Sequence, residues 1–313
     1  MIAAKMAKGV HLKESYVQLV ARTASHRYKV YDIPKKTGGT RTIYHPAREL
    51  KLLQTWLVDT LLSKLPVHAA AAAYKPGSSV KKHANVHRHS KFLLRVDFRN
   101  FFPSITGRDV VGVLKKNFDS AGSFFSSPRD YEIVRRIVCR ADQLTIGAPS
   151  SPVLSNAVMY GFDLDWASRC RTRSVAYTRY ADDLYFSTNR PNILTPLLEE
   201  LRSDLRHRKS PVLQINDEKT VFTSRKRRRL VTGVVITPEG RLSLGRNRKR
   251  FIKSLIFRHT QGDLSPEQTS YLRGFISFAK SVEPTFIKTL ESKYGSDALS
   301  AVLNDNRRGV PHE

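Results

Sequence analysis

The sequence predicts an α+β protein in which antiparallel strands carry helices on one side. Short apolar runs with strand character alternate with segments whose apolar residues recur at helical spacing. With 40% apolar residues, the 313-residue chain can bury a core, which excludes global disorder. No apolar run reaches the roughly 18 residues that a membrane span requires, which excludes a span. We expect no membrane partner.

Strand and helix signals follow one another along the chain. Residues 28–33 and 41–44 are typical of a hairpin around residues 35–39, and helical spacing begins near Arg48. We interpret the alanine run 69–73 as the end of that helix. The later predicted elements are a strand over 92–96, helices over 130–140 and 152–167, strands over 174–178 and 184–187, a helix over 196–208, strands over 213–215 and 231–236, and a mainly helical segment from 245 onward.

The charge of the chain indicates a polyanionic partner. Lys and Arg number 54 and Asp and Glu 27, which gives a net charge of +27 and an isoelectric point near 10.3. Nucleic acid is the leading candidate, because phosphate neutralisation dominates such affinities. An acidic membrane surface and a merely soluble basic surface are the alternatives. The two cysteines, Cys139 and Cys170, fit a reducing compartment, and no secretory signal is evident, so we expect a cytoplasmic protein.

Three aspartates interrupt this basic background at the ends of apolar strands. Asp182 and Asp183 lie in a Tyr-Ala-Asp-Asp turn between two apolar runs, and Asp97 ends a third run. Carboxylates held close together repel one another, and a divalent cation relieves that cost. Two magnesium ions about 4 Å apart are the usual catalysts of nucleotidyl transfer. An ordinary hairpin turn is the alternative interpretation of the Asp-Asp pair.

The acidic turn belongs to an ordered set of motifs, which are Arg41-Thr-Ile-Tyr44, Tyr74-Lys-Pro-Gly-Ser78, Leu94-Arg-Val-Asp-Phe-Arg-Asn-Phe-Phe-Pro-Ser104, Gly147-Ala-Pro-Ser-Ser-Pro152, Tyr180-Ala-Asp-Asp183, Leu213-Gln-Ile-Asn-Asp-Glu-Lys-Thr220 and Val231-Thr-Gly233. Through these motifs the chain resembles bacterial retron reverse transcriptases over about residues 28 to 295. His83-Ala-Asn-Val-His87 resembles an Asn-Ala-x-x-His element of the same family, with His83 in place of Asn. Family members often carry Gln where this chain has Ile146, which removes one expected contact with the incoming nucleotide.

The resemblance implies a right-hand polymerase with fingers, an antiparallel palm sheet and a helical thumb. We expect an N-terminal segment and fingers over 1–90, a palm with interleaved fingers elements over 91–236, and the thumb over 237–313. The expected activity is RNA-templated DNA synthesis from dNTPs with two Mg²⁺ ions. The expected product is a branched RNA–DNA hybrid, copied from a cognate noncoding RNA and primed from a guanosine 2′-OH. Such enzymes act in antiphage defence, usually beside a separate effector protein.

The resemblance also assigns roles to residues of the reaction site. Asp97 and Asp182 are the expected metal ligands, joined by Asp183 and the carbonyl of Phe98. Phe102 is expected to exclude a ribose 2′-OH, although plain core packing is the alternative. Lys219 is expected to hold or protonate the leaving pyrophosphate, although a solvated lysine is the alternative. The remaining candidates for nucleotide binding are Arg41, Lys36, Gly147, Ala148 and Pro149.

Two basic runs, the segments 83–87 and 231–233, and Arg273 supply the candidates for RNA binding. These candidates are His83, His87, Arg225, Arg227, Arg228, Arg229, Val231, Thr232, Gly233, Arg246, Arg248, Lys249, Arg250 and Arg273. Hydrogen bonds within the fold are the alternative for the two histidines. Zinc is disfavoured, because no cysteine or acid lies at ligand spacing from them. The aromatic residues of 271–278 recur three and four apart, and we interpret them as core of a thumb helix, with base stacking as the less favoured alternative.

Two functional alternatives differ from the retron interpretation. One is a defence-associated polymerase that makes DNA without a branched primer, against which the segment 231–233 argues. The other is an RNA-binding scaffold with vestigial catalysis, against which the three intact aspartates argue.

Overall fold

The computed structural model describes residues 1–35, 38–118 and 124–304. The chain divides into two compact units. Unit 1 comprises Met1–Ser78 and Leu94–Phe222, and unit 2 comprises Ser79–Leu93 and Thr223–Glu313. Among the helices that the structure describes, none is long and apolar enough to cross a membrane.

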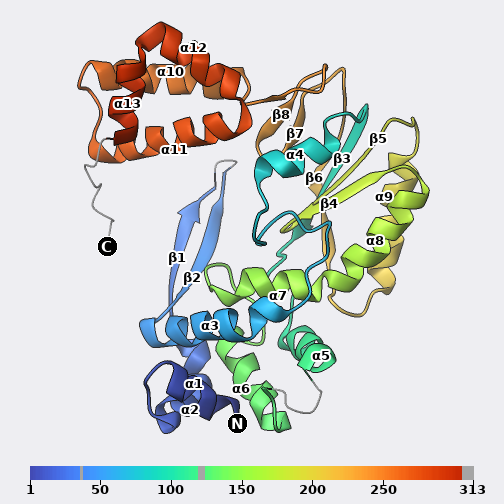
Figure 1. The fold of residues 1–313 in the computed structure, drawn as a ribbon. Helices are drawn as coiled ribbons and strands as arrows, with labels where there is room; N and C mark the ends of the chain where they lie inside the picture. Colours follow the sequence, from blue (N-terminus) through green and yellow to red (C-terminus); the bar gives the residue numbers. More distant parts are fainter. Residues whose placement is uncertain (36–37, 119–123, 305–313) are drawn as a thin grey trace. The chain divides into compact units, whose positions relative to one another are not determined.

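Unit 1 begins with a layer of helices that is followed by a β-hairpin. Helices α1, α2, α3 and α6 pack against one another, and the antiparallel strands β1 and β2 precede α3 (Figure 1). The elements of this part are α1 (Ile2–Gly9), α2 (Glu14–Thr23), η1 (Ala24–His26), β1 (Tyr28–Pro34), β2 (Thr40–Pro46), α3 (Arg48–Thr60), η2 (Leu62–Lys64), α5 (Gly107–Phe118), α6 (Pro128–Val138) and α7 (Ser150–Val158). The predicted hairpin and the helix starting near Arg48 are therefore confirmed.

A four-stranded sheet forms the second part of unit 1. Its strand order is β4-β5-β3-β6, and β4 and β5 are antiparallel. Helix α8 packs along β4, and α9 packs along β5 (Figure 1). The core between them includes Trp166 and Phe186, whose rings meet edge to face at 5.9 Å. The bounds are β3 (Phe92–Arg99), α8 (Tyr160–Thr172), β4 (Ala176–Tyr180), β5 (Asp183–Thr188), α9 (Leu194–His207) and β6 (Gln214–Ser224).

Unit 2 combines a small three-stranded sheet with a group of four helices. Strands β7, β8 and β9 form the sheet in that order, and α4 packs on all three. Helices α10 to α13 pack against one another around apolar residues that include Ile252, Leu272 and Leu290 (Figure 1). The bounds are α4 (Val80–His87), β7 (Arg229–Val231), β8 (Val234–Ile236), β9 (Leu242–Ser243), α10 (Arg246–Thr260), α11 (Pro266–Val282), α12 (Pro284–Tyr294) and α13 (Ser296–Asn304).

The structure corrects three predicted elements. The alanine run 69–73 does not end a helix, because α3 stops at Thr60; the run instead contacts β4, through a bridge between Ala71 and Arg179. The predicted helix over 152–167 is two helices, α7 and α8, which are separated at Met159. The predicted strand over 231–236 is a pair of strands, because the backbone turns between Val231 and Val234.

Candidate active site

The Tyr-Ala-Asp-Asp segment forms the tight turn between β4 and β5. Tyr180 pairs with Asp183, so Ala181 and Asp182 are the two residues of the turn. Ala181 has a positive φ of 55°, as tight hairpins require, although this region is costly for a residue with a Cβ atom. The guanidinium of Arg179 donates a hydrogen bond to the carbonyl of Ala181 at 3.2 Å, which supports the turn from inside the fold.

The sheet brings Asp97 to this turn. The strand order places β3 beside β5, and the backbone N–H of Phe98 donates to the carbonyl of Asp182 at 3.0 Å. Asp97 is almost fully buried, with 5% of its surface exposed. Two segments that lie far apart in the sequence thus place their carboxylates side by side, as the motifs predicted.

Strand β6 supplies partners for Asp97. The ammonium of Lys219 donates to the two carboxylate oxygens of Asp97 at 3.1 and 3.3 Å, and the amide of Asn216 donates to one of them at 3.1 Å. The Lys219 side chain is half exposed, so its charge faces both the carboxylate and the solvent. Lys219 is therefore a member of the cluster, whereas Asn216 was not predicted from the sequence.

The carboxylates of the turn carry a cost of burial and of mutual repulsion. Burial raises the pKa of Asp183 to about 6, and the nearby guanidinium of Arg95, 3.5 Å away, opposes that rise. Burial also raises the pKa of Asp182, and the charge of Asp97 raises it further. Asp183 Oδ1 is buried and accepts no hydrogen bond from the described residues. A bound cation would remove this cost.

These residues fit a divalent cation by the chemistry of their donors. Asp97 and Asp182 offer hard oxygen ligands, and Mg²⁺ typically uses one or two carboxylates and completes its shell with water and phosphate. Within residues 1–35, 38–118 and 124–304, no three side chains of His, Cys, Asp or Glu are already arranged to hold a metal. The partners of Asp97, above all Lys219, occupy the oxygens that a cation would use.

A fully buried ion pair supports the turn from the interior of the fold, and the sequence did not predict it. Arg179 donates to Asp163 on α8 at 2.6 Å, and neither side chain is exposed. Asn156 accepts a bond from Arg179 at 3.1 Å and donates to the carbonyl of Ala73 at 2.9 Å. The arginine directly before Tyr180 inside an apolar run was the available signal, because a buried arginine requires a carboxylate partner.

The predicted nucleotide-binding loop lies against the hairpin of β1 and β2. The N–H of Tyr44 donates to the carbonyl of Ile146 at 2.8 Å. Gly147 has a φ of 112°, and a Cβ atom there would lie 2.8 Å from the carbonyl oxygen of Tyr44, so only glycine fits. Ala148 is buried, and Pro149 precedes α7. Glycine at this position therefore permits the close approach of the loop to β2.

The remaining candidates for nucleotide binding differ in their exposure to solvent. Arg41 is exposed on β2, and its charge lowers the pKa of Asp182 against the larger raising effect of burial. Phe102 is partly exposed, whereas its neighbours Phe98 and Phe101 are buried. This exposure disfavours plain core packing of Phe102. Lys36 lies outside the described residues.

In unit 2 the segment 83–87 contacts the segment 231–233. The turn between β7 and β8 consists of Thr232 and Gly233, both with positive φ, and Thr232 Oγ1 lies 3.3 Å from His83 Nδ1. His83 and His87 are 2% and 1% exposed, and their rings meet edge to face. This burial favours the alternative of hydrogen bonds within the fold and does not support direct contact with RNA.

The basic candidates divide into buried and exposed groups. Arg229 is 1% exposed and donates to the carbonyls of Ser90 and Thr237, so its burial corrects its predicted role in RNA contact. Val231 is buried as well. The side chains that form contacts within unit 2 or are partly covered are Arg225, Arg248, Lys249 and Arg273. The exposed side chains are Arg227, Arg228, Arg246 and Arg250.

Comparison with known proteins adds to this geometry. The family model of the reverse transcriptase (RNA-dependent DNA polymerase) matches residues 33–236. The chain is 38% identical to the retron Ec83 reverse transcriptase of Escherichia coli, over 94% of this chain and 95% of that protein. It is 33% identical to the retron Ec86 reverse transcriptase of Escherichia coli, over 94% and 91%. It is also 33% identical to the retron Ec73 reverse transcriptase of Escherichia coli, over 85% and 86%.

Proposed function

The chain belongs to the reverse transcriptase family and, within it, to the retron enzymes, and from this premise we propose the reaction that it performs. It is an RNA-directed DNA polymerase of a retron. We propose that it copies part of a cognate structured noncoding RNA from dNTPs. The primer is the 2′-OH of a guanosine in that RNA, and the product is a branched RNA–DNA hybrid that stays bound to the enzyme.

The observation that carries this proposal is the hydrogen bond from Phe98 to Asp182, which holds Asp97 beside the turn. In the proposed reaction the primer hydroxyl attacks the α-phosphorus of the dNTP, and pyrophosphate leaves. Asp97 and Asp182, with the Phe98 carbonyl, would hold two Mg²⁺ ions, and Asp183 adds negative charge. When bound, the two ions would activate the attacking hydroxyl and stabilise the leaving oxygen.

The neighbouring residues receive matching roles. Lys219, which already reaches Asp97, would hold or protonate the leaving pyrophosphate. Arg41 would clamp the triphosphate, and the loop 147–149 would shape the nucleotide site. Phe102 would exclude the 2′-OH of a ribonucleotide. We propose the same division into domains as the sequence predicted: an N-terminal segment and fingers over 1–90, a palm with interleaved fingers elements over 91–236, and a thumb over 237–313.

In unit 2 the exposed bases are the proposed contacts with RNA phosphates. Four arginine side chains are exposed and can therefore contact the phosphates of a bound strand: Arg227, Arg228, Arg246 and Arg250. Thr232 and Gly233 shape a turn at which the retron RNA would be recognised.

Nuclease treatment of the nucleic acid bound to the protein tests the branched product. The wild-type protein is purified from its native locus, and the bound nucleic acid is extracted and treated with RNase or DNase. Single-stranded DNA that becomes smaller after RNase is the expected result. DNA unchanged by RNase would replace the proposal with an unbranched polymerase, and RNA without DNA would indicate a scaffold. The control is the double variant D182N/D183N, from which RNA alone is expected.

We further propose that the enzyme acts in the bacterial cytoplasm in antiphage defence, beside a separate effector protein. Membership among retron enzymes supports this role. Deletion of the gene from its native locus should raise phage plaque counts, and the D182N/D183N gene should fail to restore protection. Equal plaque counts across a broad phage panel would contradict the role in defence.

A further inference from the structure

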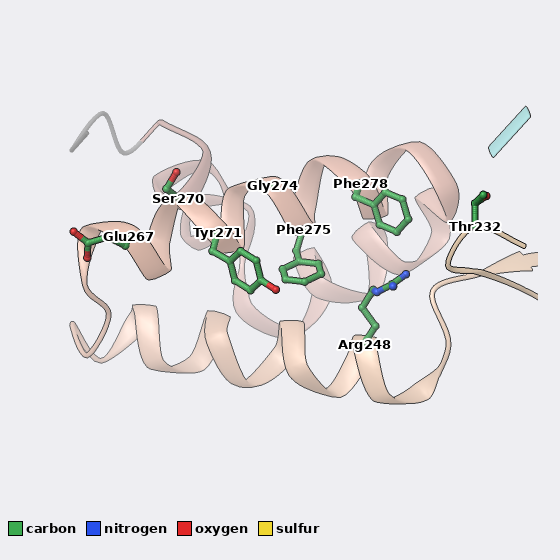
Figure 2. Close-up of a pocket in the computed structure, with 8 residues that line it drawn as sticks. All are labelled: Thr232, Arg248, Glu267, Ser270, Tyr271, Gly274, Phe275 and Phe278. Carbon is green, nitrogen blue, oxygen red and sulfur yellow. The ribbon is translucent and has the colours of Figure 1, made fainter. Parts of the chain in front are cut away.

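A pocket of about 680 Å³ opens in unit 2 between α10, α11 and the turn that carries Thr232. Figure 2 shows Tyr271, Phe275 and Phe278 of α11 along it, with Arg248 of α10 and Thr232 at one end. All of its lining residues belong to unit 2. The volume lies in the range of sites that bind small molecules or single bases.

The aromatic side chains of the pocket do not belong to the helix core, which corrects our interpretation of residues 271–278. The core face of α11 includes Leu272, Ile276 and Ala279, which are at most 1% exposed. Tyr271 is 52% exposed and meets Phe275 edge to face, at 4.6 Å between ring centroids. Rings held in this way are rigid stacking surfaces that cost little conformational entropy on binding.

Gly274 keeps the floor of the pocket open. A Cβ atom at this position would meet no atom within 4 Å, so no neighbour in the described structure requires glycine there. Glycine inside a helix costs roughly 1 kcal/mol relative to alanine. The space above Gly274, between the aromatic rings, is therefore available to a ligand.

The two ends of the pocket carry opposite charges, which determines how a charged ligand would be oriented in it. The Arg248 guanidinium lies over the ring of Phe278 at 5.2 Å and donates to the carbonyl of Gly233 at 2.8 Å. Figure 2 shows Glu267 at the opposite end, where a phosphate would be repelled. An anionic group of a ligand therefore belongs at the Arg248 end, and an uncharged planar group belongs over the aromatic rings.

We propose that this pocket binds an unpaired base of an RNA strand, which stacks on the face of the Tyr271 ring and meets the perpendicular ring of Phe275 at its edge, while its phosphate lies near Arg248. The inference rests on the proposed function and deepens it, because it adds a stacking contact with a base to the phosphate contacts of the basic runs. The net charge of +27 favours a polyanion over another protein as the occupant. Only an unpaired base exposes the face that these rings can stack on.

Affinities for two strands of equal charge test the proposal. The probes are a fluorescent oligoadenylate of ten ribonucleotides and a ten-unit abasic ribose-phosphate strand, both measured by anisotropy at fixed salt concentration. The variants are Y271A, which removes a stacking ring, and G274L, which fills the pocket. Both should weaken oligoadenylate binding roughly tenfold and leave abasic binding unchanged, because stacking is lost and phosphate contacts stay. Leucine favours a helix over glycine, so G274L should fold.

The matched control is Gly161, an exposed helical glycine of unit 1 at which a Cβ atom would also meet nothing within 4 Å. G161L should bind both strands like the wild type. Equal losses on both strands, or no loss with Y271A and G274L, would overturn the proposal. No loss in RNA affinity, with a change in sedimenting mass for G274L, would assign the pocket to a second copy of the chain. Failure of the proposed function would show separately, as absence of RNA-linked DNA from the wild-type protein.

Discussion

Arg179 and Asp163 form an ion pair at 2.6 Å from which solvent is fully excluded. The pair is well satisfied, because the guanidinium also donates to the carbonyl of Ala181 and the carboxylate accepts from the hydroxyl of Tyr177 at 2.8 Å. Helix α8 is thereby connected to the turn that carries Asp182. The position of Asp182 thus depends on the buried guanidinium of Arg179.

Replacing Asp163 by Asn should destabilise the protein by about 3–5 kcal/mol, because the Arg179 charge stays buried without its counter-charge. Urea denaturation of the wild type and of D163N measures the difference. The control is D165N, since Asp165 on the same helix pairs with Arg208 at 2.9 Å and is half exposed. That change should cost less than about 1 kcal/mol. Equal losses would contradict the special role of the buried pair.

Replacing Asp182 by Asn should lower dTMP incorporation on an oligo(dT)-primed poly(rA) template more than about a hundredfold, because a proposed metal ligand is lost. RNA binding should remain, since the charge on the basic runs is unchanged. Chelation with EDTA should abolish wild-type incorporation, and added Mg²⁺ should restore it. D32N, at an exposed position of the hairpin, is the matched control and should retain activity. Full activity of D182N would remove this residue from the proposed site.

The cluster of Asp97, Asp182 and Lys219 could be predicted because most of its signals are local. Apolar strands on both sides of a two-residue turn determine the hairpin that presents Asp182, and the apolar run that forms most of β3 ends at Asp97. Lys219 follows from the resemblance, and the structure places it on Asp97. The α+β class follows from the same alternation of strand and helix patterns.

Burial of one base within a basic run could not be predicted, because nothing local distinguishes it from its exposed neighbours. Arg229 belongs to a run of five bases, residues 225–229, yet it is the one member of that run that is fully buried, where it donates to the backbone carbonyls of Ser90 and Thr237. The exposure of the aromatic residues of α11 could not be predicted either. Their spacing places Tyr271 and Phe275 on one face, but only packing against neighbouring helices decides that Leu272 and Ile276 face the core.

Replacing Phe102 by Ala should raise the ratio of ribonucleotide to deoxyribonucleotide incorporation, because a bulky ring would no longer oppose a 2′-OH. Partial exposure of Phe102 beside buried Phe101 supports this role. The measurement is competition between UTP and dTTP in primer extension. F101A is the contrasting variant, which should lose about 3–5 kcal/mol of stability without relaxed sugar selection. An unchanged ratio in F102A would return the ring to a packing role.

Buried histidines in unit 2 predict a loss of stability in mild acid. Burial lowers the pKa of His83 to about 4, and burial together with the charge of His83 lowers the pKa of His87 to about 3. An unfolded histidine takes up its proton near pH 6.5. Between these values the unfolded chain binds more protons than the folded protein, so the free energy of unfolding falls as the pH falls from about 6.5 toward 4.

Replacing His83 by Asn should reduce this acid sensitivity. Asparagine cannot take up a proton, and its amide can still bond Thr232, whose hydroxyl lies 3.3 Å from the His83 ring. Between pH 7 and pH 5 the wild type should lose about 2 kcal/mol more than H83N, as measured by urea denaturation at each pH. H45N, at an exposed position on β2, is the matched control and should lose as much as the wild type. If H83N kept the full acid sensitivity, the proton taken up on unfolding would have to come from another group.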